Sequence, residues 1–294
     1  MAIGQLPLPA AALIFSRIVQ ERGKMSHLRV ATWNVNSVRA RLAHVETFVE
    51  QSQPDILCLQ ETKVTDNEFP LKSFAKMGYE HYAIAGQKSY NGVAIFSKIP
   101  FVTTEPIQWC GKDDKRHLAI TLETGMEIHN FYVPAGGDIA DVALNDKFAH
   151  KLDFMTEMAD WFAERRTDDN KMILVGDLNV APFETDVWNH KQLLKVVSHT
   201  PIEVEHMARM YESHGWIDAM RHFVPEPEPL FSWWSYRARD WRASNRGRRL
   251  DHVWVTPALK PHLKAMEIAF TSRDWEKPSD HAPVIVDFDL TGMR

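Results

Sequence analysis

The segment Pro278-Ser279-Asp280-His281-Ala282-Pro283 carries a candidate catalytic pair. Its Asp-His pair stands between two prolines, directly before the apolar run 284–288. A histidine beside a carboxylate can meet a phosphate at neutral pH. Comparable polar residues end other predicted strands: Asn34, Glu61, Tyr132, Asp177, Asn179 and Asp251. Acidic and amide groups at several strand ends favour one metal-assisted hydrolytic site.

Two of these residues suit a metal ion. Glu61 stands in Leu59-Gln60-Glu61-Thr62-Lys63, where an apolar strand ends, and Asn34 ends a neighbouring strand in Trp33-Asn34-Val35-Asn36. A lone glutamate at a strand end is usually only solvated. A carboxylate together with an amide oxygen suits a hard cation such as Mg²⁺, which takes few protein ligands and keeps several waters.

Asp177 and Asn179 follow a fully apolar strand in Gly176-Asp177-Leu178-Asn179. They are two residues apart, so in an extended segment their side chains point the same way. The pair can hold and activate a water beside a metal. The alternative is an ordinary turn rich in Asp and Asn.

Asp251 and Tyr132 are two further candidates at strand termini. Asp251, in Arg249-Leu250-Asp251, can orient another site residue or bind metal. Its alternative is a structural salt bridge with a nearby arginine, since buried aspartates are usually paired. Tyr132, in Asn130-Phe131-Tyr132-Val133-Pro134, can donate to a phosphate oxygen, although a tyrosine of the core or its rim is the commoner case.

A dense arginine cluster follows the aromatic run 231–236. Aromatic side chains next to arginines suit stacking on unpaired bases together with phosphate contacts. The alternatives are a solvated arginine-rich loop and aromatic residues that hold a long loop to the core. Only Asp240 opposes the cluster, which consists of Arg237, Arg239, Arg242, Arg246, Arg248 and Arg249.

The composition predicts a globular chain with a sizeable core. It has 294 residues, 45% hydrophobic and 25% charged, and a net charge of -5 that does not attract nucleic acid globally. Cys58 lies in an apolar run and is expected in the core, and with Cys110 it makes no disulfide framework or zinc spacing, so a reducing compartment is expected. No apolar stretch approaches the roughly 20 residues of a membrane span.

The pattern of elements mixes helices and strands. We predict strands at 28–35, 56–60, 172–175, 250–255 and 283–290, a meander of short strands over 81–133, and helices at 38–51, 145–165 and within 190–214. Strands both early and late favour one domain, 25–294, built from two sheets with helices outside. Residues 1–24 are expected to be a dispensable extension.

Together these motifs resemble the exonuclease III family of apurinic/apyrimidinic endonucleases, within the wider endonuclease/exonuclease/phosphatase superfamily. The resemblance runs from Leu28 to Leu290. The wider superfamily shares the Asn, Glu, Gly-Asp-x-Asn and Ser-Asp-His elements. The Leu-Gln-Glu-Thr-Lys string and the Ser-Trp-Trp-x-Tyr-Arg run are typical of the DNA-repair branch.

The resemblance implies an α/β fold of two packed β-sheets flanked by helices, a four-layer α/β sandwich. It implies that Glu61, with Asn34 nearby, holds Mg²⁺ or Mn²⁺, and that Asp251 and Asp280 support the metal site. Asp177 would act on the attacking water, with Asn179 orienting it. His281, held by Asp280, would stabilise the phosphate, and Tyr132 would contact it. The implied DNA contacts are Arg116, Trp233, Trp234, Tyr236, Arg237, Arg246 and Arg248.

Three positions depart from the family pattern. Ala135 stands where Asn or Gln is usual, and Ser235 stands where Asp is common. Arg248 replaces an aromatic or apolar residue that can probe an abasic gap in relatives. These positions surround the metal site, so they are expected to affect substrate preference and not hydrolysis.

The predicted activity is a magnesium-dependent DNA-repair nuclease. It would cut the backbone of double-stranded DNA 5′ to an abasic site, with 3′-5′ exonuclease and 3′-end-cleaning activity. We expect a monomer in the cytoplasm, associated with the nucleoid through DNA. A phosphatase acting on a small or lipid phosphate ester is one alternative, which the arginine-aromatic loop disfavours. A non-catalytic DNA-binding module is the other, which the costly cluster of polar groups disfavours.

Overall fold

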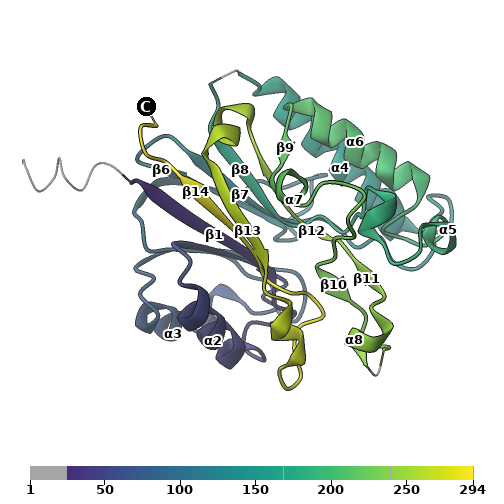
Figure 1. Cartoon of the computed structure of the whole chain (residues 1–294), viewed down its shortest axis with the longest axis horizontal. Helices are drawn as coiled ribbons and strands as arrows, with labels where there is room; N and C mark the ends of the chain where they lie inside the picture. Colours follow the sequence, from purple (N-terminus) through teal and green to yellow (C-terminus); the bar gives the residue numbers. More distant parts are fainter. Residues whose placement is uncertain (1–24, 168, 239, 294) are drawn as a thin grey trace, which may run out of the picture.

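The protein folds into four layers (Figure 1). The structure is a computed structural model that describes residues 25–167, 169–238 and 240–293, so the predicted extension 1–24 and Arg239 lie outside it. In the described residues, two six-stranded mixed sheets pack face to face, and helices cover both outer faces. This architecture confirms the predicted fold. No helix in those ranges is both long and apolar enough to cross a bilayer.

The first sheet is covered by α2 (Leu42–Ser52) and α3 (Leu71–Lys76). Phe48 and Phe74 from these helices pack on its outer face beside Trp33 and Phe96. The first strand runs parallel to the second and antiparallel to the last. The strand order is β13 (Leu263–Ile268), β14 (Val284–Asp289), β1 (His27–Asn34), β2 (Ile56–Gln60), β4 (Val93–Ser97) and β3 (His81–Ala85).

The second sheet is covered by α4 (Asp146–Glu164) and α6 (Pro201–Ser213). As the 3.6-residue period predicts, α4 buries one stripe of its surface against the sheet, which includes Phe148, Leu152, Met155, Met158 and Phe162. The strand order is β5 (Phe101–Glu105), β6 (His117–Leu122), β7 (Glu127–Tyr132), β8 (Met172–Asp177), β12 (Asp251–Val255) and β9 (Ile217–Asp218).

Shorter elements connect the layers. The hairpin of β10 (Trp233–Trp234) and β11 (Gly247–Arg248) projects beyond the sheets and carries the arginine-rich loop at its tip (Figure 1). The remaining elements are α5 (His190–Leu193), α7 (Ala219–Phe223), α8 (Trp241–Ser244) and the 3-10 turns Asp66–Glu68, Glu184–Asp186, Pro257–His262 and Phe270–Asp274.

The core between the sheets is apolar with one polar bridge. Cys58 is fully buried in it, as predicted. Gln60 Nε2 donates to Asn130 Oδ1 at 2.7 Å across the two sheets, and Asn130 Nδ2 donates to two backbone carbonyls. Because the side-chain N–H donors of this buried network have partners, the network fixes the position of one sheet relative to the other close to the site.

Some elements were missed by the prediction, and one helix start was predicted wrongly. The edge strand β5 was not predicted because it is mostly exposed, and β13 was not predicted because a register shift between Leu263 and Ala265 interrupts its alternation. The helix predicted from Val38 starts at Leu42, since the Val38 amide donates to the Thr62 carbonyl and ties this residue to the end of β2.

Five strand termini meet at one edge of the sandwich. These are the ends of β1, β2 and β8 and the starts of β12 and β14. Gly176 permits a close approach there, because a Cβ at this position, with φ +138°, would lie 1.9 Å from the Phe131 carbonyl oxygen. The polar residues of these termini therefore converge.

Candidate active site

Asn34 joins two carboxylates at this edge. Its Nδ2 donates to Glu61 Oε1 at 2.8 Å and to Asp177 Oδ2 at 2.9 Å, while its Oδ1 accepts from the Asn36 amide. Lys63 Nζ lies 2.7 Å from Glu61 Oε2. Burial by itself raises the pKa of Glu61, but the Lys63 charge and the Asn34 amide outweigh it and hold that pKa below its ordinary value. Glu61 is therefore a carboxylate at neutral pH.

Left-handed backbone turns these side chains inward. Glu61 and Asn179 have φ of 51° and 54°, values that few residues other than glycine adopt. Asn179 Nδ2 donates to the Val133 carbonyl at 2.9 Å and to Asp177 Oδ2 at 3.2 Å, and its backbone N–H donates to Asp177 Oδ1. The Asp177–Asn179 segment is thus a compact turn that presents both side chains to one place.

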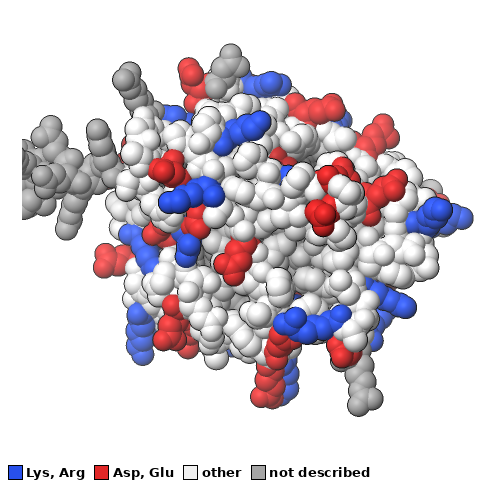
Figure 2. All heavy atoms as spheres, viewed as in Figure 1, with Lys and Arg blue, Asp and Glu red and all other residues white. Residues whose placement is uncertain are grey.

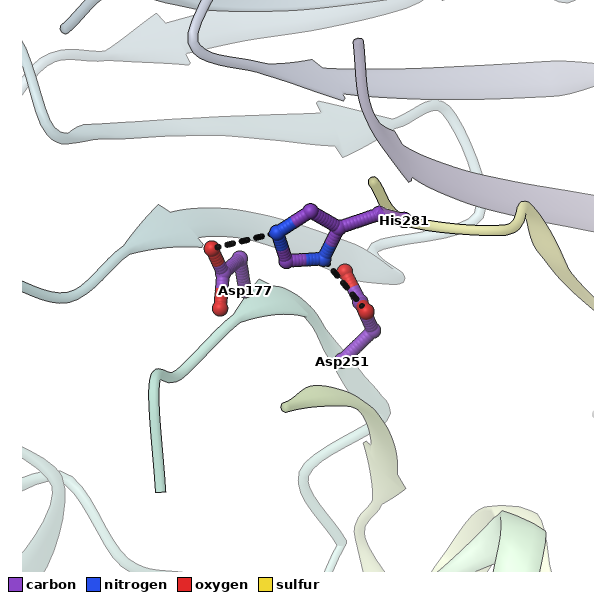
Figure 3. Close-up of side chains that lie close together, drawn as sticks. All are labelled: Asp177, Asp251 and His281. Atoms are coloured by element: carbon purple, nitrogen blue, oxygen red, sulfur yellow. Dashed lines mark hydrogen bonds and ion pairs between the residues drawn. The ribbon is translucent and has the colours of Figure 1, made fainter. Parts of the chain in front are cut away.

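His281 lies between Asp177 and Asp251 (Figure 3). Its Nδ1 is 2.8 Å from Asp251 Oδ2, and its Nε2 is 3.6 Å from Asp177 Oδ2. Burial lowers the pKa of His281, but the negative charges of Asp251 and Asp177 outweigh it and raise that pKa to about 10. Burial raises the pKa of Asp177 to about 7, against the opposing effect of His281. The ring is therefore an imidazolium at neutral pH beside a carboxylate that can exchange a proton there.

One predicted contact of His281 is wrong. The histidine is held by Asp251 and not by Asp280, whose carboxylate accepts from Trp233 Nε1 at 3.0 Å and Asn36 Nδ2 at 3.2 Å. Asp251 orients another site residue, as predicted, and the alternative salt bridge does not form with Arg249, which is bound to other carboxylates. A metal role for Asp280 stays a prediction.

Several supporting residues were not assigned by sequence. Ser232 Oγ donates to Asp251 Oδ2 at 2.7 Å, and Ser279 Oγ donates to the Asn34 carbonyl at 2.6 Å. Lys63 Nζ also donates to Asn36 Oδ1 at 2.6 Å. Ser232, Ser279, Lys63 and Asn36 all belong to the motifs quoted above. A motif does not say, however, which backbone or side-chain group a hydroxyl, an ammonium or an amide will contact.

Tyr132 ends β7 beside the carboxylates and is 8% exposed. Burial, and next the charges of Glu61 and Asp177, raise its pKa well above the ordinary value, so the phenol keeps its proton. The Arg116 guanidinium lies 4.8 Å over the Tyr132 ring, and Arg116 also pairs with Asp114. Arg116 is buried and lines a second cavity of about 320 Å³ next to Tyr132, so its predicted DNA contact stays a prediction.

The catalytic residues open into a cleft of about 810 Å³. Glu61, Asp177, Asn179 and His281 line it, and the arginine-rich hairpin forms one wall. Ala135, Ser235 and Arg248, the three departures from the family pattern, line it as well. On the face shown in Figure 2, basic side chains lie around the projecting hairpin with acidic ones among them.

The predicted DNA contacts differ in accessibility. Arg237 and Arg246 are exposed, Tyr236 is 50% exposed, and Trp233 and Arg248 are half-buried. Trp234 is only 5% exposed, and its indole N–H donates to Asn245 Oδ1 at 3.1 Å. Trp234 therefore shapes the hairpin in this conformation and has no open face for a base.

The donor set fits a hard divalent cation. Four acidic side chains, Glu61, Asp177, Asp251 and Asp280, gather here, and the ion pairs that they form in the described residues are with two cations, Lys63 and His281. Asp251 Oδ1 is buried and makes no hydrogen bond within the described residues. Ligand atoms of Asp177, Asp251 and His281 lie within 4.8 Å of one another. Buried excess negative charge with an unsatisfied oxygen is what an oxygen-liganded cation compensates.

Two facing mixed sheets with a buried carboxylate–histidine centre at one edge define a phosphoesterase of the four-layer α/β type. A family model described as the Endonuclease/Exonuclease/phosphatase family matches residues 31–281, and the chain belongs to this family. The family is typically metal-dependent.

Within the family the chain is similar to DNA-repair nucleases. It is 32% identical over 272 residues to exodeoxyribonuclease III of Haemophilus influenzae, covering 89% of this chain and 100% of that relative. An AP endonuclease structure from Archaeoglobus fulgidus has a TM-score of 0.83 at 31% identity, covering 89% and 99% of the two chains. A 3′-5′ exonuclease, NExo, from Neisseria meningitidis has a TM-score of 0.82 at 31% identity, covering 89% and 100%. The predicted family is confirmed, and the chain is a hydrolytic nuclease of the DNA-repair class.

Proposed function

We propose that this nuclease, with Mg²⁺ or Mn²⁺, cleaves double-stranded DNA 5′ to abasic sites and leaves a 3′ hydroxyl, and that it also trims or cleans 3′ ends. The observation that carries the proposal is Asp177, a buried carboxylate in the cleft with a pKa raised to about 7, next to Asn34, Asn179 and His281. Relatives named as AP endonuclease and as 3′-5′ exonuclease support both activities.

Glu61 and Asp251 are the residues that would hold the cation, since both offer carboxylate oxygens and Asp251 Oδ1 has no other partner in the described chain. A bound divalent cation would neutralise charge on the non-bridging phosphate oxygens. Asn34 presents its NH₂ to the carboxylates and so orients Glu61 and Asp177. We also propose that the amide oxygen of Asn34 coordinates the cation.

The remaining residues supply the proton transfer and the anion contacts. Asp177 takes a proton from the attacking water, and Asn179 orients that water. The His281 imidazolium, fixed by Asp251, donates to the phosphate as charge develops on it. Tyr132 keeps its phenolic proton and donates a hydrogen bond from it to the same phosphate. These groups account for hydrolysis without a covalent nucleophile on the protein.

The hairpin 233–248 would grip the DNA. Trp233 is half-buried beside Arg248, whose guanidinium lies 5.1 Å from its ring, and Arg237 and Arg246 are exposed on the cleft wall. Stacking together with phosphate contacts is the mode that such a surface favours. A single domain with the whole cleft built from one chain can act as a monomer.

The test is cleavage of a duplex with one abasic-site analogue, with Mg²⁺ or with EDTA, by the unmodified protein and by Asp177→Asn. We expect a metal-dependent cut 5′ to the lesion and a loss of rate by a factor of about 10² to 10⁴ in the variant, the usual contribution of a general base. Thermal unfolding of the variant controls for its fold.

Other outcomes point elsewhere. If only 3′ ends are trimmed, the catalytic assignment stands and abasic-site cleavage is wrong, with Ala135 and Arg248 as the first positions to change. If no DNA is cut in any metal, a phosphatase activity or a non-catalytic DNA-binding role replaces the proposal. Cleavage that continues in Asp177→Asn removes Asp177 from the chemistry.

A further inference from the structure

A buried ion pair lies directly beneath the catalytic turn. Lys151 of α4 and Glu203 of α6 have side chains with 0% exposure, and Lys151 Nζ donates to Glu203 Oε1. A gain in folding stability does not explain this ion pair, because burying both charges costs a desolvation free energy that their mutual attraction only partly offsets. The contacts that each partner makes beyond the pair therefore matter.

The ammonium of Lys151 reaches the catalytic turn. It donates to the Asn179 backbone carbonyl at 2.7 Å and lies 3.5 Å from the Ala135 carbonyl. With Glu203, these contacts use its three N–H groups. Asn179 is the residue whose left-handed backbone aims its amide at Asp177, so Lys151 holds that conformation from below.

The stem of Lys151 shapes the neighbouring turn as well. A Cβ at Gly136, which has φ +87°, would lie 2.9 Å from Lys151 Cδ and 3.2 Å from Val197 Cγ1. The turn that carries Ala135 therefore rests on the aliphatic part of this lysine. The backbone at Ala135 and at Asn179, both of which line the cleft, therefore contacts one side chain of α4.

Glu203 anchors the other side of the cleft. Its carboxylate accepts from the Ser198 amide at 2.9 Å, the Thr200 amide at 3.1 Å and Thr200 Oγ1 at 2.6 Å, which also caps α6. The Ser198 carbonyl in turn accepts from the Ala181 amide at 2.7 Å. These acceptor functions need oxygens but no negative charge, whereas the Lys151 contacts need a long donor.

We propose that Lys151 is a positioning residue for hydrolysis, which fixes the Asn179 and Ala135 backbone so that Asn179 and Asp177 keep their catalytic arrangement. The inference rests on the proposed function, in which this pair orients and deprotonates the water. Lys151 touches neither substrate nor metal, so its loss lowers turnover and leaves DNA affinity unchanged. A misplacement of about 1 Å in such a site costs up to about 100-fold in rate.

The test uses Lys151→Met/Glu203→Gln, which removes the donor and the charge together and keeps an oxygen acceptor for Ser198 and Thr200. The control is Arg209→Met/Asp160→Asn, which removes an exposed ion pair between the same two helices whose members do not line the cleft. A third variant, Glu203→Gln, keeps the lysine. Thermal unfolding, DNA affinity in EDTA, kcat and KM on the abasic duplex are measured for each.

We expect kcat of the Lys151 double variant to fall roughly 10- to 100-fold with KM and DNA affinity unchanged. The control and Glu203→Gln should keep the kcat of the unmodified protein. A folded double variant with unchanged kcat overturns the proposal, and so does a Glu203→Gln variant that loses as much as the double variant. If the first double variant does not fold, Lys151→Gln/Glu203→Gln is tested by the same criteria. The glutamine that replaces Lys151 keeps a polar donor, but its amide nitrogen ends one atom short of the position of the ammonium. Failure of the unmodified protein to cut the duplex is a failure of the proposed function instead.

Discussion

Two clusters of buried carboxylates flank the start of β12, and they differ in how their charges are balanced. In the first, Arg249 donates to both oxygens of Asp186 at 2.8 and 2.9 Å and to Asp218 at 2.5 Å. Arg221 also donates to Asp186, so two cations meet two anions. Two residues further along the chain, Asp251 belongs to the second cluster, where four carboxylates form ion pairs with two cations, Lys63 and His281.

The comparison separates a structural network from a reactive one. The Arg249 network neutralises its charges within the protein and has no carboxylate oxygen without a partner in the described residues. The catalytic cluster keeps excess negative charge and an unsatisfied oxygen on Asp251, which is buried beside His281 of the cleft lining. Buried uncompensated charge costs free energy unless a ligand compensates it. A structural network should therefore control stability, and the catalytic cluster should respond to metal and pH.

The largest expected effect on stability is that of Arg249→Met. It leaves Asp186 and Asp218 buried without this partner, so the free energy of unfolding should fall by about 3–5 kcal/mol. Urea unfolding measures it. The kcat of the folded fraction on DNA should change little, because Arg249 does not line the cleft. A variant as stable as the parent would show that the two clusters do not differ as described.

Metal removal should affect only the catalytic cluster. With free Mg²⁺ at about 100 times its Kd, binding to the folded state adds about 2.7 kcal/mol of stability, which EDTA removes. Titration of the unfolding free energy with MgCl₂ measures this for the parent and for Glu61→Gln. We expect Glu61→Gln to lose most of the gain and Arg249→Met to keep it. An equal gain in Glu61→Gln would place the ion elsewhere.

Counted per unit of pH, the smallest effect is the pH dependence of stability in the metal-free protein. The pKa of His281 is raised from an ordinary 6.5 to about 10, so its contribution to stability is complete below about pH 6.5 and is lost as pH rises through about 10. The slope should approach about 1.4 kcal/mol per pH unit between these values. Unfolding in EDTA across this range, compared with His281→Gln, measures it. Parallel curves for the two proteins would exclude this role of His281.

The fold was largely predictable because its central elements have strong patterns. The strand Ile56–Gln60 was predicted with its observed bounds, and the α4 stripe was predicted from its 3.6-residue period. The edge strands Phe101–Glu105 and Leu263–Ile268 were not, because the first is mostly exposed and a register shift between Leu263 and Ala265 interrupts the alternation of the second. Pairing with one neighbour, and not composition, makes these segments strands.

The site shows the same division between local and long-range information. The sequence by itself determined which polar residue types lie at the strand termini, because each adjoins an apolar run that must be buried. Only the tertiary structure decided that His281 is held by Asp251 and that Asp280 binds Trp233 instead. Asp280 and His281 are neighbours in the sequence and both line the cleft, yet they contact different partners. The pairing of β12 with β8 brings Asp251 beside Asp177 from a distant part of the chain, and no local spacing encodes that contact.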